Sequence, residues 1–195
     1  MAAAGKVLTG FSKPYVALYS VSTAGVVSYS DGQILARGVD MTISPETSDD
    51  NKFYADNQMA ENAGGLFTGG TLSLTVDGLL EPAEKLVFGL GSASGNWYAF
   101  DDDMDPPYMG FAAIARYMSD GVTSYTPVAL TKVRFKPLEL SAATQEDEID
   151  WQTQAMEASI FRDDSAKHVW KKLGEAQTTE ASAEALIKTL FGITP

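Results

Sequence analysis

Apolar and polar residues alternate along much of this chain, and the alternation predicts a protein built mainly from β-strands. In residues 71–76, TLSLTV, leucine or valine occupies every second position, and serine or threonine occupies the positions between them. Because successive side chains of a strand point to opposite faces, this segment has one apolar and one polar face. Residues 33–44 show the same period, and short turn-like stretches separate them from predicted strands at 15–21 and 25–30.

Three later segments are predicted strands of unusual length. They cover residues 108–118, 122–135 and 148–161, whereas strands usually have about five or six residues. Ser-Asp-Gly at 119–121 joins the first two into a hairpin, and a shorter strand is predicted at 96–100. Some of the long strands must extend beyond a compact sandwich.

Two segments change to a helical period. Residues 81–90 carry Pro82 where a first helical turn tolerates it, and glycine follows. In residues 179–195 the apolar positions recur every three or four residues, with Thr179 as N-cap and Gly192 just past the end. The apolar stripe of this second helix needs a partner, which lies either on its own sheet or on a neighbouring subunit.

The predicted fold class is therefore mainly β, an antiparallel β-sandwich or barrel with a short flanking α-helix and a C-terminal helix. We divide the chain into a β domain at 1–178 and a helical tail at 179–195. A length of 195 residues suits a single core. The sequence shows neither a secretory signal nor a membrane segment, so we expect no membrane partner and synthesis in the cytosol.

Composition and motifs argue against an enzyme, a metal site and a cofactor. The chain has no cysteine and a net charge of −12, which disfavours a surface that binds nucleic acid phosphates. Asp101, Asp103 and Asp105 have the spacing of a calcium loop, but proline stands where that loop needs glycine and alanine where it needs glutamate. We interpret them, and the carboxylates at 146–150, as solvated turns. His168, the single histidine, lies outside any nucleophile motif and is expected to be packed or on the surface.

Aromatic and basic side chains are predicted to serve the core or subunit interfaces. The aromatic residues could also stack on sugars, but they lack interleaved cations and so favour anchoring; they are Trp97, Tyr98, Phe100, Trp151 and Trp170. Three cations, Lys132, Arg134 and Lys136, share one strand face. Given the acidic chain, we expect them to pair with a neighbour's carboxylates.

Several motifs, in this order and spacing, resemble one family. They are FYADN at 53–57, ENAGG at 61–65, GTLSLTVDGL at 70–79, KVRF at 132–135 and TQEDEIDWQTQ at 144–154. Together they resemble the major tail tube proteins of bacteriophages with long, non-contractile tails, in the group typified by phage phi13. The resemblance spans roughly residues 14–175 and includes neither the first dozen residues nor the C-terminal helix.

The resemblance implies a structural protein of the virion, assembled in the host cytoplasm. Six copies would close into a ring, rings would stack into a tube that conducts the genome, and other tail proteins (tape measure, tail terminator, initiator complex) would be partners. It also implies that a long loop at about 45–70 contacts the next ring. The contact candidates in this loop are Asp49, Asp50, Phe53, Tyr54, Asp56, Glu61, Leu66 and Phe67.

An acidic lumen would let DNA pass without specific binding, because cations are what make DNA adhere. Polar or acidic positions on the longest strands, Asp40 and Glu157, are the lumen-facing candidates. Two other classes stay open. One is an adhesin or carbohydrate-binding β-sandwich module, and the other is a metal-dependent hydrolase built on the carboxylates at 101–105.

Overall fold

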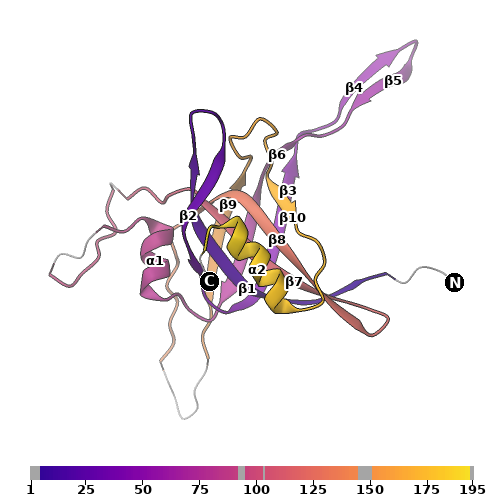
Figure 1. Cartoon of the computed structure of the whole chain (residues 1–195). Helices are drawn as coiled ribbons and strands as arrows, with labels where there is room; N and C mark the ends of the chain where they lie inside the picture. The colour runs from indigo at the N-terminus through magenta and orange to yellow at the C-terminus, as the bar shows by residue number, and fades with distance from the viewer. Residues whose placement is uncertain (1–4, 92–94, 103, 145–150, 194–195) are drawn as a thin grey trace.

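The computed structural model describes residues 5–91, 95–102, 104–144 and 151–193 (Figure 1). The chain is mainly β, with one antiparallel sheet of eight strands, a separate two-stranded hairpin and two helices. This architecture confirms the predicted fold class. The sheet comprises β1 (Val7–Val21), β2 (Val27–Ile34), β3 (Gly38–Thr47), β6 (Phe67–Val76), β7 (Met109–Ser119), β8 (Val122–Phe135), β9 (Gln154–Phe161) and β10 (Lys171–Leu173).

The sheet curls around the larger of two hydrophobic clusters, and the smaller one lies between its outer face and the second helix. Its strand order is β2-β1-β7-β8-β9-β6-β3, with β10 paired to the middle of β8. The curl brings β3, at one end of the strand order, back into contact with β1, near the other end. Inside lie the buried side chains of β6 (Leu72, Leu74 and Val76), as their alternation predicts.

Strand β7 is apolar along its whole first half because both of its faces are covered. Phe111 and Ala113 point into the enclosed core, whereas Ala112 and Ile114 point to the opposite face. That opposite face carries the second helix. A strand buried on both sides cannot alternate in polarity, which explains the run from Met109 to Ala115.

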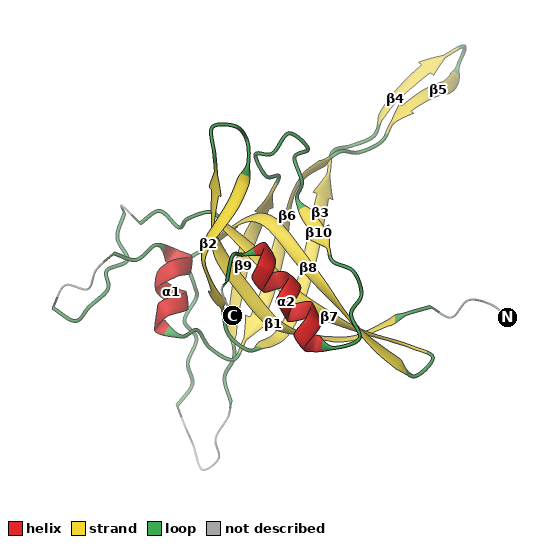
Figure 2. Cartoon of the chain, viewed as in Figure 1, coloured by secondary structure: helices red, strands yellow, loops and turns green. Residues whose placement is uncertain are grey.

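Both predicted helices form, and each covers part of the sheet (Figure 2). Helix α1 (Glu81–Phe88) ends at Gly89 with φ 64° and adds Val87 and Phe88 to the enclosed core. Helix α2 (Glu180–Leu190) lies across β7 and β8 and buries Ala183 and Ile187. Neither helix, nor any other helix among the described residues, is long and apolar enough to cross a membrane.

The caps of α2 follow the sequence prediction. The Thr179 hydroxyl accepts from the Ser182 N–H at 3.2 Å. At the other end Gly192 adopts φ 64°, and the Ile193 N–H reaches back to the Lys188 carbonyl at 2.9 Å. Because Ala183 and Ile187 are buried against β7 and β8, the partner surface of this helix is its own sheet.

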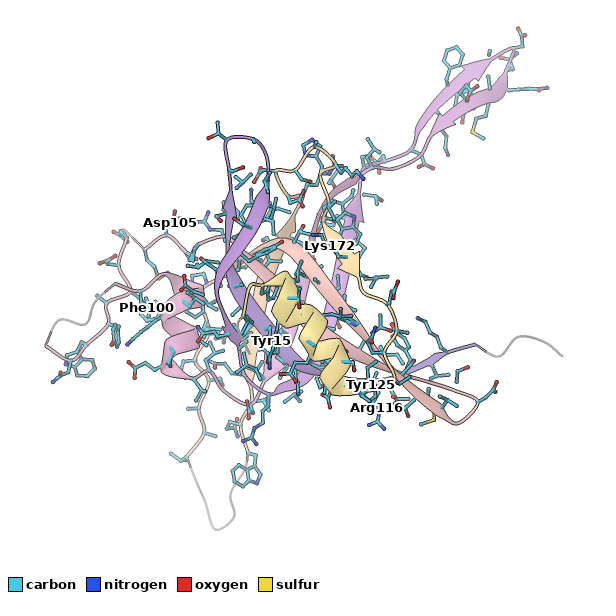
Figure 3. All side chains as sticks on the ribbon, viewed as in Figure 1. Tyr15, Phe100, Asp105, Arg116, Tyr125 and Lys172 are labelled. Atoms are coloured by element: carbon cyan, nitrogen blue, oxygen red, sulfur yellow. The ribbon has the colours of Figure 1, made fainter. Side chains whose placement is uncertain are left out.

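Charged side chains tie α2 to β1, in a cluster that we call the α2 latch (Lys13, Tyr15, Glu184 and Lys188; Figure 3 shows Tyr15 beside the helix). Glu184 pairs with Lys13, accepts from the Tyr15 hydroxyl at 2.7 Å and lies 2.9 Å from the Lys188 amine. The hydrogen bond from Lys13 is the main cause that lowers the pKa of Glu184 to about 2. Burial, together with the bond to Glu184, raises the pKa of Tyr15.

One predicted strand does not form, and another is shorter than predicted. Residues 96–100 form no strand, because Trp97 makes an isolated bridge only and the chain there runs over the surface. Strand β9 starts at Gln154; residues 151–153 are irregular and residues 148–150 lie outside the described residues. Met156 is the first residue of β9 whose side chain is buried in the enclosed core.

Candidate assembly surfaces

Residues 45–70 form a strand-built projection and not the predicted loop. The end of β3 and the start of β6 reach into this range, and between them lies an antiparallel hairpin of β4 (Asn51–Ala55) and β5 (Gln58–Ala63). We call residues 48–66 the arm. Figure 1 shows the arm standing well away from the sheet.

The arm turns at two residues that both have positive φ, Asp56 at 51° and Asn57 at 60°. This is the geometry of the tight hairpin turns that Asp and Asn favour. The sequence analysis missed this turn because glycine, which usually occupies the second position of such a turn, is replaced by Asn57. The Asp-Asn pair between Tyr54 and Met59, which pair across the hairpin, was the available signal.

Apolar side chains of the arm are left uncovered by their own chain. Phe53 is 62% exposed, Tyr54 61% and Leu66 68%. An isolated two-stranded hairpin is only marginally stable in water, and exposed aromatic clusters mark interaction sites. The arm therefore has the properties of a segment that is covered by a partner.

Two contact candidates also make contacts inside the subunit. Phe67 leaves the arm and stacks on Trp170, with ring centroids 4.5 Å apart and planes 3° from parallel. The Asp50 carboxylate accepts from the Gly65 N–H at 3.1 Å and so braces the base of the arm. The other acidic candidates, Asp49, Asp56 and Glu61, are exposed and form no ion pair within the described chain.

The lumen-facing candidates Asp40 and Glu157 lie on one shared sheet face. In cross-strand register, Asp40 pairs with Thr75 and Thr42 with Ser73, which in turn pairs with Glu157. We call this the polar face; its members on β3, β6 and β9 are exposed or half-buried. They are Asp40, Thr42, Ser44, Thr71, Ser73, Thr75, Ala155, Glu157 and Ser159.

The three cations of β8 already have carboxylate partners in their own chain. Lys132 lies 2.7 Å from Asp164, Arg134 pairs with Asp105, and Lys136 pairs with Glu157. The hydrogen bond from Lys132 is the main cause that lowers the pKa of Asp164. Pairing with a neighbour's carboxylates would thus require exchange of an existing ion pair, which the sequence alone did not indicate.

The described residues of the acidic segment and the histidine lie in separate surroundings. Within the described ranges no three Asp, Glu, His or Cys side chains come together as a metal site. Asp105 pairs with Arg134, whereas Asp103 and residues 146–150 lie outside the described residues. His168 is exposed at a turn, with Nδ1 3.3 Å from the Asp163 carbonyl.

The predicted aromatic anchors divide into two groups. Trp170 is half-buried against the core, and Phe100 lies 6.1 Å from Phe88 on the side of the molecule that carries α1 (Figure 3). Trp97 and Trp151, by contrast, are 80% and 83% exposed. Neither of these two tryptophans serves the core of its own subunit.

Comparison with known proteins leaves the chain unassigned. No protein-family model matches it, and no curated protein matches it. The class of protein must therefore be argued from its sequence motifs and from the surfaces described above.

Proposed function

We propose that this protein is a structural subunit of a phage tail tube, in which six copies form a ring and rings stack into a hollow tube. The observation that carries the proposal is the arm. It is an antiparallel hairpin whose register shifts between Phe53 and Tyr54, and both of these aromatic side chains are more than half exposed. Such a hairpin needs a partner surface to be stable. The motifs that resemble tail tube proteins include this arm.

The polar face supports the choice of a conduit. Its side chains are small, hydroxylated or acidic, and the two cations of β8 that neighbour it, Arg134 and Lys136, pair with Asp105 and Glu157. With a net charge of −12 per chain, a ring of six copies would repel phosphates. DNA would then slide past this surface instead of adhering to it.

The proposal includes a place and a set of partners. The subunit is part of the virion tail and is assembled in the host cytoplasm together with a tape measure protein, a tail terminator and an initiator complex. We further expect the arm to be mobile in the free subunit and ordered by stacking. Hydrogen exchange that protects the arm equally in both states would contradict this expectation.

Negative-stain microscopy of the purified protein tests the function. Rings or tubes of uniform bore are expected at high concentration, and persistent monomers under every condition would overturn the proposal. Cryo-electron microscopy of the assembly tests the lumen. Asp40 and Glu157 are expected to face the channel, and a ring with both side chains on its outer surface would refute that part.

A carbohydrate-binding adhesin is the second candidate, because Trp97 and Trp151 are exposed and tryptophan rings stack on sugars. Glycan or cell-wall binding by the purified protein that disappears in both Trp97→Ala and Trp151→Ala would favour it. Absence of binding to a broad glycan array would count against it.

A further inference from the structure

The curled sheet leaves an apolar pocket at one end, which we call the end pocket. Its volume is about 460 Å³, and its lining includes Leu8 and Phe11 of β1, Val39, Asp40 and Ile43 of β3, Tyr117 of β7 and Lys171 of β10. Leu8 is 59% exposed and Val39 56%. Large aliphatic side chains at this exposure, grouped around one hollow, indicate a contact surface.

The end pocket and the arm lie at opposite ends of β3. The pocket is lined by Val39, Asp40, Met41 and Ile43 in the first part of the strand, whereas the arm begins just after Thr47 at its finish. At about 3.3 Å per residue, these lining residues lie four to eight steps, or roughly 13–26 Å, from the base of the arm. Figure 1 shows the arm leaving the sheet at the end of β3.

The tip of the arm is apolar and ends in the Asp56 carboxylate, whereas the end pocket is lined by apolar side chains together with Lys171 and Asp40. Tyr54 and Met59 pair across the hairpin and are 61% and 54% exposed, so together they form an apolar tip. A pocket of this volume holds ligands larger than one side chain. The Asp56 carboxylate at the turn and the Lys171 amine at the pocket both lack an ion-pair partner within the described chain.

We propose that the arm tip of one copy inserts into the end pocket of a second copy in the next ring, with Asp56 against Lys171. This inference rests on the proposed stacking of rings. Because the two surfaces differ and lie at opposite ends, each copy keeps one arm and one pocket free. A contact of this heterologous kind builds open-ended, polar assemblies instead of closed dimers.

Disulfide trapping tests the contact, and the natural chain contains no cysteine to interfere. The pair Met59→Cys with Leu8→Cys places one thiol at the tip and one at the pocket rim. Oxidation of assembled tubes is expected to give a ladder of linked chains on a denaturing gel, since disulfides form only when Cα atoms approach within about 7 Å. The matched control pairs Met59→Cys with Val7→Cys, an equally exposed neighbour on the opposite face of β1.

A ladder with Leu8→Cys and none with Val7→Cys supports the proposal. Tubes that give no ladder, or equal ladders in both, overturn it while leaving the tube function intact. Wild-type protein that forms no tubes under any condition overturns the tube function itself and the inference with it.

A second test reverses the charge of Lys171. It measures the protein concentration at which half of the chains are in tubes. Lys171→Glu is expected to raise it at least tenfold, because all six contacts of a ring weaken together. Lys172→Glu, on the opposite face of β10 and labelled in Figure 3, should change it less than twofold. If the double variant Lys171→Glu with Asp56→Lys returns this concentration to the wild-type value, the pair is confirmed. Equal effects of Lys171→Glu and Lys172→Glu refute it.

Discussion

Replacing Glu184 with glutamine should weaken the attachment of α2 to the sheet in a way that depends on pH. The carboxylate holds the α2 latch together, pairing with Lys13 and Lys188 and accepting from the Tyr15 hydroxyl. Glutamine keeps the size of the side chain and one acceptor oxygen but loses the charge. It therefore imitates the protonated state of glutamate at this position.

The size of the effect follows from the lowered pKa. A fall from 4.5 to about 2 on folding corresponds to roughly 3 kcal/mol, which we reduce to about 2 kcal/mol because Lys13 is a third exposed and screened by solvent. A carboxyl whose pKa is lowered in the folded state stabilises the protein above its unfolded pKa. That stabilisation is lost as the pH falls from 4.5 towards 2.

Urea denaturation of both proteins, followed by circular dichroism from pH 7 to pH 3, measures the difference. We expect the wild type to be more stable by about 2 kcal/mol at pH 7 and by less than half of this at pH 3. Glu175→Gln, an exposed carboxylate without an ion pair in the described chain, is the control and should change stability by under about 0.5 kcal/mol. A difference for Glu184→Gln that is the same at both pH values would refute the reasoning.

Three further substitutions test the fold by the same denaturation assay. Thr179→Ala removes the N-cap of α2 and should cost about 1 kcal/mol, whereas an equal loss in Thr178→Ala would contradict the capping assignment. Gly110→Ala would place a methyl group 2.5 Å from the Tyr29 ring and should cost about 1–3 kcal/mol, so a neutral result would show that the ring can move. Phe111→Ala empties a fully buried site and should cost about 3–5 kcal/mol; a loss below about 1 kcal/mol would place this ring outside the core.

Secondary structure could be predicted from the sequence wherever it depends on residues close together in the chain. The alternation in β6 located its buried face, and the Ser-Asp-Gly turn located the β7–β8 hairpin, where Asp120 and Gly121 both have positive φ. The ends of α2 were readable because the N-cap and the C-terminal glycine act within one helical turn. The prediction of a strand at 96–100 was wrong because its aromatic residues suggested burial, whereas Trp97 and Phe100 are exposed.

The candidate surfaces depended more on structure. The residues of the arm were identified, but the arm was expected to be a loop. Its two strands are short, so the pairing of Tyr54 with Met59 produces only a weak strand pattern in the sequence. The cations of β8 were correctly placed on one face, yet their partners Asp164 and Asp105 come from distant segments. No sequence pattern predicts the end pocket, since its lining combines residues of five strands.

A β-sheet with two helices could be predicted from the order of amino acids, because strand and helix periods and turn residues are properties of adjacent positions. The net charge of −12 and the absence of a thiol follow directly from the composition. Three arrangements become visible only in the folded chain: α2 covers its own sheet, Asp40 and Glu157 share one face, and the end pocket and the arm lie towards opposite ends of β3. Those arrangements depend on which strands pair and how the sheet curls, and residues far apart in the chain settle that together.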